Sequence, residues 1–149
     1  RSFIDWITDR LDKPESFIHA YNMKKLAKTG DVNPYIQHNV MHMLNSWVRA
    51  ELHDMINWYI GTRHGFDIST GKNGKYFKKY LSPELYSQYA TTYSGSGYAS
   101  IWASIDAMCD LFHALAVTVA AHFGFNYRQN EEARIREYLR MLREDEGGR

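Results

Sequence analysis

Hydrophobic and polar positions recur along this chain with the spacing of α-helices. Between residues 34 and 61 the apolar positions follow the period of about 3.6 residues, which predicts one long helix. A similar pattern predicts a second long helix over residues 98–123. Its apolar seam consists of Trp102, Ile105, Cys109, Phe112, Ala116, Val119 and Phe123. We expect these two helices to form the centre of the fold, where the first contributes Trp47, Leu52 and Ile56 to the core.

Prolines and glycines mark where the predicted helices begin and end. Pro14 opens a helix over residues 14–29 that Gly30 stops, because proline suits a first helical turn and glycine suits the residue after a last one. Gly61 is expected to close the first long helix, and Pro83 to open another helix.

The remaining segments predict further helices and no strand. A short helix is expected at 75–81, the helix that begins at Pro83 ends near residue 93, and an amphipathic helix covers 130–144. No segment alternates as a strand would. The sequence therefore predicts an all-α fold, a bundle of about five helices with two long central ones, in a single helical domain over residues 1–149.

Composition and charge exclude several classes of protein. The formal net charge is +1, which argues against a nucleic-acid binder with a broad basic face. No apolar run approaches the roughly 20 residues of a membrane-spanning helix, and the best candidate, 111–125, contains two histidines. Cys109 is the single cysteine, so no internal disulfide can form and a cytoplasmic location is expected. The chain begins with Arg1 rather than Met, which suggests a piece of a longer protein.

Two histidines are the best candidates for metal ligands. His38 and His42 lie four residues apart, on one face of the first long helix, and His19 or His113 would have to supply a third ligand. Two ligands do not make a site, so we favour two partly exposed polar histidines and expect no metal site in this chain. Cys109 is interpreted as an inert core residue, since its position matches the apolar seam.

A cluster of lysines in the segment TGKNGKYFKKYL, residues 70–81, calls for an explanation. Lys72 and Lys75 each follow a glycine, and Lys78 and Lys79 come soon after. Glycines let a backbone approach a ligand closely, and ammonium groups neutralise phosphate oxygens. A polyphosphate is one plausible partner, and a solvated basic loop is the alternative.

The chain resembles a known family from about residue 45 to residue 128. The lysine segment and the residues after it match through Gly71, Lys72, Asn73, Lys75, Lys78, Tyr80, Thr92, Tyr93, Tyr98, Ile101 and Trp102. The segment before it matches through Arg49, Glu51, Leu52, Met55, Ile56, Trp58, Ile60, Gly61, Gly65, Phe66 and Ser69. This pattern is similar to the C-terminal region of the aminoglycoside 6-adenylyltransferase (streptomycin adenylyltransferase) family.

The resemblance implies one part of a two-domain antibiotic-resistance enzyme that transfers AMP from ATP to a drug hydroxyl. The N-terminal nucleotidyltransferase domain, with its Gly-Ser motif and metal-binding aspartates, is missing from this chain. ATP and Mg²⁺ are therefore expected in the full-length enzyme and not on this chain alone. The helical domain would close the cleft over nucleotide and aminoglycoside, with Lys72, Lys75, Lys78 and Tyr93 at the phosphates.

One position departs from the family pattern. Related drug-modifying enzymes have an acidic residue on the long second helix that deprotonates the drug hydroxyl, and this position falls at Ser46 here. A serine is no useful general base at neutral pH. Asp31, Glu51 or Asp54 could take that role. Alternatively, the chain is a non-catalytic helical module that binds a ligand or a protein. The acceptor substrate, the position modified and the oligomeric state stay open.

Overall fold

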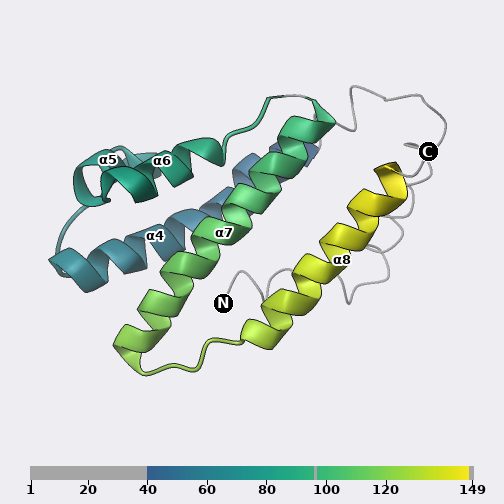
Figure 1. Ribbon diagram of the computed structural model, residues 1–149. Helices are drawn as coiled ribbons and strands as arrows, with labels where there is room; N and C mark the ends of the chain where they lie inside the picture. The colour runs from purple at the N-terminus through teal and green to yellow at the C-terminus, as the bar shows by residue number, and fades with distance from the viewer. Residues whose placement is uncertain (1–39, 96, 148–149) are drawn as a thin grey trace. The chain divides into compact units, whose positions relative to one another are not determined.

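The computed structural model describes residues 40–95 and 97–147, and its regular structure there is entirely helical (Figure 1). The π-helical turn Leu44–Val48 leads into α4 (Arg49–His64), and the short 3₁₀ turn Lys72–Gly74 precedes α5 (Phe77–Tyr80). The chain continues through α6 (Pro83–Thr91), α7 (Tyr98–Phe123) and α8 (Gln129–Gly147). The prediction of an all-α fold is confirmed. The helix predicted at 14–29 lies outside the described residues.

The chain divides into two compact units, residues 37–127 and residues 1–36 with 128–149, and each is described by itself. In the first unit α4 and α7 pack along each other, and α6 packs on α7 (Figure 1). The core side chains of this unit are Leu52, Met55, Ile56, Ile60, Phe77, Tyr89, Met108, Leu111, Leu115 and Val119. That one helical domain covers residues 1–149 stays a prediction.

The first long helix ends later than the glycine pattern predicts. Gly61 lies inside α4 and is buried, and a Cβ there would lie 2.3 Å from Cε1 of Phe66. The helix ends at His64 because Gly65 adopts φ 94° and ψ 155°, a backbone conformation that in practice only glycine tolerates. The prediction that Gly61 closes the helix is therefore wrong: Gly61 makes room for an aromatic ring, and Gly65 is the stop.

Replacing Gly65 with alanine is expected to lower the free energy of unfolding by about 1–3 kcal/mol, because φ 94° strains any residue with a Cβ. Denaturant unfolding followed by circular dichroism would measure the loss. Gly95→Ala is the matched control, since the nearest atom to its added Cβ, Oγ of Ser100, is 3.5 Å away. Equal unfolding midpoints for the two variants would contradict the assignment.

The predicted buried face of the long helices is confirmed in part, since Leu52, Ile56, Phe112, Ala116 and Val119 are buried. Trp47 is 43% exposed, since the π turn around it widens the helix and shifts the register of its side chains. In α7 the buried positions are Ile101, Ser104, Met108, Leu111, Phe112, Leu115, Ala116 and Val119. The predicted core residues Trp102, Ile105 and Cys109 are only half-buried. Phe123 is 46% exposed.

The long helix α7 also corrects the expectation that no segment could span a membrane. Among the described helices, this one is long and apolar enough to do so by length and composition alone. In its most apolar stretch, 44% is buried inside the structure. A helix that packs on both α4 and α6 needs such a composition for the core of a folded domain.

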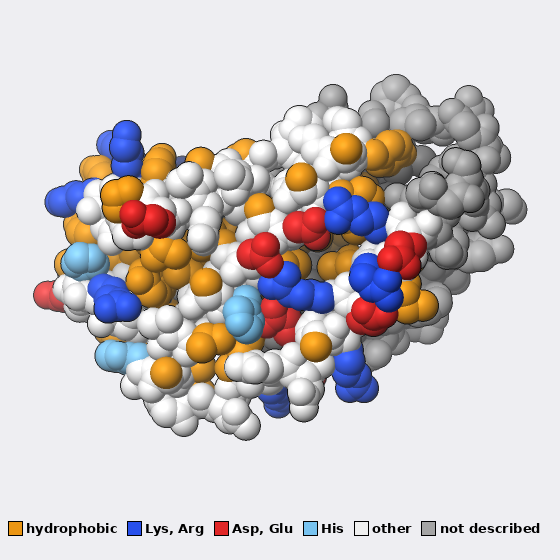
Figure 2. Space-filling model, viewed as in Figure 1, with side chains coloured by type: hydrophobic (Ala, Val, Ile, Leu, Met, Phe, Trp, Pro, Cys, Tyr) orange, Lys and Arg blue, Asp and Glu red, His pale blue; other side chains and the backbone are white. Residues whose placement is uncertain are grey.

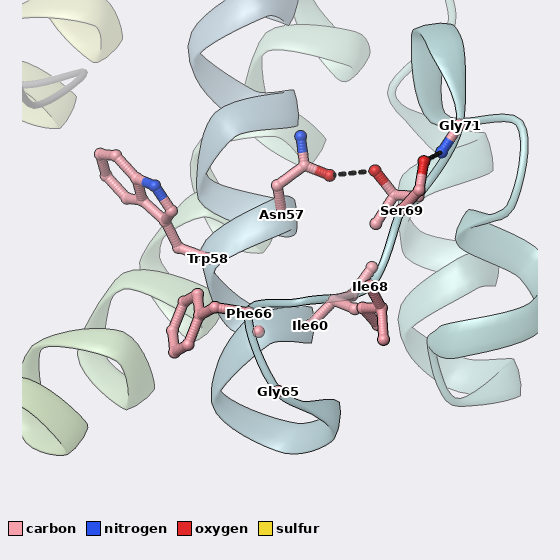
Figure 3. Close-up of a pocket in the computed structure, with 10 residues that line it drawn as sticks. Asn57, Trp58, Ile60, Gly65, Phe66, Ile68, Ser69 and Gly71 are labelled. Carbon is pink, nitrogen blue, oxygen red and sulfur yellow. Dashed lines mark hydrogen bonds between the residues drawn. The ribbon is translucent and has the colours of Figure 1, made fainter.

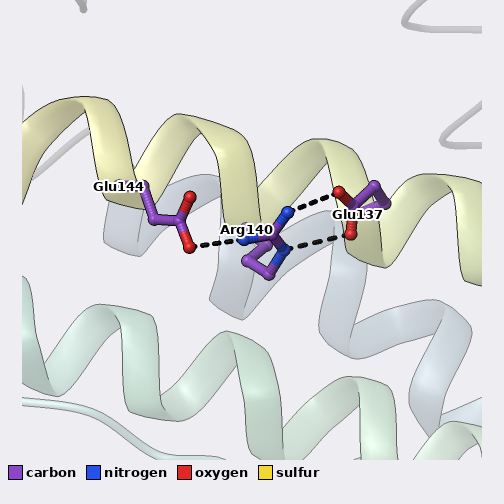
Figure 4. Close-up of polar contacts among 3 residues, drawn as sticks. All are labelled: Glu137, Arg140 and Glu144. Atoms are coloured by element: carbon purple, nitrogen blue, oxygen red, sulfur yellow. Dashed lines mark hydrogen bonds and ion pairs between the residues drawn. The ribbon is translucent and has the colours of Figure 1, made fainter.

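The helix α8, taken by itself, carries a ladder of ion pairs. Arg136 bonds Glu132 at 2.9 Å, and Arg140 bonds both Glu137, at 2.5 Å, and Glu144 (Figure 4). The hydrogen bond from Arg140 lowers the pKa of the Glu137 carboxyl. Exposed pairs of this spacing support a helix only weakly, so we assign them to local helix stability and to no site.

Candidate functional site

The lysine segment follows α4 as an ordered loop. Thr70 donates a hydrogen bond from Oγ1 to Oδ1 of Asn57 on α4 at 2.6 Å, which fastens the loop to the helix. The backbone N–H of Tyr76 then bonds the carbonyl of Thr70 at 2.9 Å. Gly74 adopts φ 73°, and a Cβ there would lie 2.4 Å from the ring of Phe77. The glycines predicted to let the backbone approach a ligand thus serve first to fold the loop tightly.

The lysines of this loop present free positive charge. Lys72, Lys75, Lys78 and Lys79 are all exposed, and none of them pairs with a carboxylate in the part of the chain that the structure describes. The Nζ atom of Lys75 lies 5.3 Å from the ring centroid of Tyr76. Figure 2 shows basic side chains projecting from the edge of the unit where α5 lies. An uncompensated group of ammonium ions attracts an anion with several charges.

A second cluster lies at the end of α6, where Thr92 and Tyr93 contact the buried side chain of Arg49. Arg49 is 5% exposed, and its two terminal nitrogens donate to Oγ1 and to the carbonyl oxygen of Thr92, both at 2.9 Å. The guanidinium also lies under the ring of Tyr93, with its Cζ 3.7 Å from the centroid. Ser104 of α7 donates a further bond to the carbonyl of Thr92. The end of α6 is therefore fixed to both long helices.

A chain of hydrogen bonds continues from Tyr93 into the interior. The hydroxyl groups of Tyr93 and Tyr89 are 2.9 Å apart, and the Tyr89 hydroxyl is 2.9 Å from Nε2 of His53. Burial, and then the bond to Tyr93, raises the pKa of the Tyr89 phenol. Burial, and then the charge of Arg49, lowers the pKa of His53, so this imidazole is neutral at pH 7.

The lysine segment and the Tyr93 cluster share one aromatic core. Phe77 of α5 is fully buried, and its ring meets the ring of His53 at 5.1 Å and that of Tyr89 at 5.4 Å, both edge-on. Tyr89 in turn contacts Tyr93, with 5.7 Å between ring centroids. The lysine segment and Tyr93, the two predicted parts of the phosphate site, are therefore connected through the packed rings of Phe77 and Tyr89. No direct bond joins a lysine to Tyr93 within the described residues.

The candidate general bases are less well defined. Glu51 is half-buried and Asp54 is exposed, both on α4, whereas Asp31 lies outside the described residues. Ser46, where the resemblance places the family's acid, is exposed in the π turn, and its Oγ lies 3.4 Å from Nδ1 of His42. Neither Glu51 nor Asp54 belongs to a group of three or more His, Cys, Asp or Glu residues among the described side chains.

The described residues do not assemble a metal site. Where side chains are placed, no three or more His, Cys, Asp or Glu residues lie close enough to hold an ion. His38 and His19, from the histidine hypothesis, fall outside the described residues. Cys109 is half-buried rather than enclosed in the core, although Phe112, Ala116 and Val119 of the same predicted seam are buried.

Sequence analysis missed a pocket of about 430 Å³ between the end of α4 and the loop that follows it (Figure 3). Trp58 and Phe66 supply aromatic walls, and Asn57 lies toward the loop side with Ser69 (Figure 3). The pocket ends at Gly71, directly before Lys72. Trp58 and Phe66 are 44% and 58% exposed, and this exposure of large apolar side chains, which marks the pocket, is visible only in the structure.

The chain is similar to proteins that act on aminoglycosides. The sequence family described as streptomycin adenylyltransferase matches residues 36–142. An aminoglycoside 6-adenylyltransferase of Staphylococcus aureus is 36% identical over 96 residues, which cover 64% of this chain and 34% of that protein. The corresponding protein of Bacillus subtilis is 34% identical over 115 residues, or 77% of this chain and 38% of that protein.

A solved structure agrees with these sequences. The crystal structure of an aminoglycoside 6-adenyltransferase from Bacillus subtilis superposes with a TM-score of 0.61 and 25% identity, over 87% of this chain and 50% of that one. This chain thus spans about a third of the length of the curated relatives. With the family matched over most of its length, the chain belongs to the streptomycin adenylyltransferase family.

Proposed function

We propose that this chain is the helical domain of an aminoglycoside adenylyltransferase, an enzyme that transfers AMP from ATP to a hydroxyl of a streptomycin-type drug. The family supports a nucleotidyltransferase in general. Its relatives are about three times as long as the matched segment, which supports a further domain with the catalytic nucleotidyltransferase centre. The single cysteine supports a cytoplasmic location.

The observation that carries the proposal is the ordered loop with unpaired lysines. Negative charge builds on pyrophosphate as it leaves ATP, and fixed positive groups stabilise that charge. Lys72 and Lys75 would supply it from the loop and Lys78 from α5, and the exposed Tyr93 would add a hydroxyl. The drug is a polycation, which these lysines would repel. The loop therefore serves the nucleotide rather than the drug.

The two expected cofactors fit this chain differently. Ammonium groups and a phenol suit the phosphate oxygens of ATP. The AMP that is transferred is released from ATP when the bond between the α- and β-phosphates breaks. Carboxylates suit Mg²⁺, and the described residues hold no cluster of them. The ligands for Mg²⁺ would then come from the missing N-terminal domain, as would most contacts to ATP.

A non-catalytic binding module is the second candidate function. Ser46, exposed where the resemblance places the acid of related enzymes, favours it, because a serine is no useful general base at neutral pH. Glu51 and Asp54 are the described candidates for a general base in the first reading, and Asp31 is the undescribed one. The full-length sequence would separate the two functions, since an upstream Gly-Ser and Asp-x-Asp motif would support the enzyme.

Lys72→Ala and Lys75→Ala in the full-length protein are expected to weaken the use of ATP. Losing one charge-assisted phosphate contact costs about 1.5–3 kcal/mol, or about 10- to 150-fold in kcat/KM for ATP. The loss falls on kcat as well as KM if the contact tightens as pyrophosphate leaves. Steady-state kinetics with ATP and with the acceptor varied in turn would measure both.

Lys79→Ala is the matched control for these variants. Lys79 lies on α5, outside the family pattern, with its Nζ 5.0 Å from the ring centroid of Tyr80. We expect this variant to change ATP kinetics little, and all three variants to leave the KM for the acceptor nearly unchanged. Small and equal effects at all three lysines would show that the loop is only a solvated surface.

A further inference from the structure

Tyr93 is an exposed side chain that buried groups hold in place. Its ring stacks on the Arg49 guanidinium at 3.7 Å, and its hydroxyl bonds that of Tyr89 at 2.9 Å, yet Tyr93 is 53% exposed. An ordinary surface tyrosine changes rotamer freely. Here one face of the ring and the hydroxyl are both engaged, while the rest of the ring stays open to solvent.

Among the described residues, only neutral groups hold the arginine beneath the ring. Besides its two bonds to Thr92, Arg49 donates from Nε to Oδ1 of Asn45 at 3.2 Å. Among the described residues no carboxylate pairs with it. A buried guanidinium without a counter-ion is costly unless its N–H groups are bonded, as they are here. A fixed positive charge therefore lies directly behind an exposed phenol.

The hydroxyl is fixed by the chain that runs to His53. When Nε2 of His53 carries its proton, His53 donates to Tyr89, and Tyr89 donates to Tyr93. The proton of Tyr93 is then left for an acceptor outside the cluster. The raised pKa of Tyr89 keeps it a phenol that can donate this bond.

We propose that Arg49 and Tyr89 are positioning residues, which hold the Tyr93 hydroxyl in place so that its proton is available to a phosphate oxygen of the nucleotide. This inference rests on the proposed function, in which Tyr93 belongs to the phosphate site. A group held in position before the ligand arrives loses less entropy on binding. The uncompensated charge of Arg49 attracts the same anion.

Hydroxyl deletions in the full-length protein test the role of Tyr89. Tyr89→Phe is expected to lower kcat/KM for ATP about 5- to 10-fold, the effect of one lost hydrogen bond. Tyr93→Phe is expected to lower it at least as much. The double variant should be no worse than Tyr93→Phe alone, because Tyr89 acts only through Tyr93. The KM for the acceptor should not change.

Tyr86→Phe is the matched control for these deletions. Tyr86 lies on the same helix, 6.0 Å from Tyr89 between ring centroids, and its hydroxyl makes no hydrogen bond among the described residues. Its ATP kinetics should equal those of the parent. Arg49→Lys keeps the charge but cannot both stack as a plane and bond two atoms of Thr92. We expect a loss of about tenfold in kcat/KM for ATP, absent in a Tyr93→Leu background.

The outcomes separate this inference from the proposed function. If Tyr89→Phe lowers kcat/KM as strongly in the Tyr93→Phe background as in the parent, Tyr89 does not act through Tyr93. The inference is then overturned, while the nucleotide role of Tyr93 stands. The inference is also overturned if Tyr89→Phe has the kinetics of the parent while Tyr93→Phe is impaired. If Tyr93→Phe itself uses ATP as the parent does, the role of Tyr93 in the phosphate site fails, and this inference fails with it.

Discussion

The Phe77→Ala variant is expected to lose about 3–5 kcal/mol of unfolding free energy. The Phe77 ring is fully buried, and it contacts His53 of α4 and Tyr89 of α6 edge-on. Alanine removes the ring from a site enclosed by two other helices, so a cavity remains. The loss includes both the transfer of the ring out of water and the packing around that cavity.

Denaturant unfolding, followed by the helical circular dichroism signal, would measure the change. Phe125→Ala is the control, since Phe125 is 71% exposed and its loss should cost no more than about 0.5 kcal/mol. Similar losses in the two variants would mean that Phe77 is not the anchor of α5.

The same variant should also disturb the lysine loop. The helix α5 has only four residues, too few for a helix that is stable by itself, so it depends on the packing of Phe77. Lys75 and Lys78 flank this anchor in the sequence. In the full-length protein, weaker ATP use should accompany the lost stability, and a destabilised variant with normal ATP kinetics would separate the loop from the nucleotide.

Helix ends that depend on local chemistry could be predicted from the sequence. Pro83 starts α6 as expected, and Ser82 before it accepts a hydrogen bond from the N–H of Leu85 at 3.2 Å. The range predicted for α7, 98–123, is the observed one. Gly61 misled the prediction, because whether a glycine ends a helix or admits a neighbouring ring depends on a contact with Phe66 that no local rule contains.

The buried face of a helix was harder to predict than its ends. Many residues around α7 are apolar, so several stripes along it have helical spacing, and only its neighbours decide which one is buried. The buried residues of α7 include Ile101, Ser104 and Met108 in place of the predicted Trp102 and Ile105, whereas Phe112, Ala116 and Val119 are buried as predicted. The prediction that Trp47 lies in the core was wrong for another reason, because the π turn breaks the helical period on which that prediction rested.

In the candidate site, too, the sequence predicted the local features and not the contacts between distant residues. Lysines after glycines are a local pattern, and the sequence identified them. The support of Tyr93 is not local, because Arg49 and Thr92 lie 43 residues apart and meet only when α6 packs beside the long helices. Arg49 was a matched position without a role, and neither His53 nor Tyr89 was noticed, since a hydrogen-bond chain has no sequence period.

The purified chain by itself is expected to transfer no AMP from ATP to streptomycin or another aminoglycoside. Metal-assisted transfer needs carboxylates that hold the ion beside the reacting phosphate, and the described residues bring no such group together. In the proposed function, the lysines and Tyr93 would stabilise charge on the leaving group but would not replace that centre. The chain spans about a third of the length of its curated relatives, in keeping with the proposed further domain.

Release of pyrophosphate from ATP, with and without the drug, would measure this activity, and the full-length protein under the same conditions is the positive control.

Supplying the proposed N-terminal part as a separate chain should restore turnover if the two parts associate. That restored activity should fall with Lys75→Ala and not with Lys79→Ala, because only the first belongs to the family pattern. The isolated chain could instead show drug-dependent turnover that persists through purification and is unchanged in Lys79→Ala. That result would show that the catalytic centre lies within these 149 residues. Asp31, Glu51 and Asp54 would then be the first carboxylates to replace.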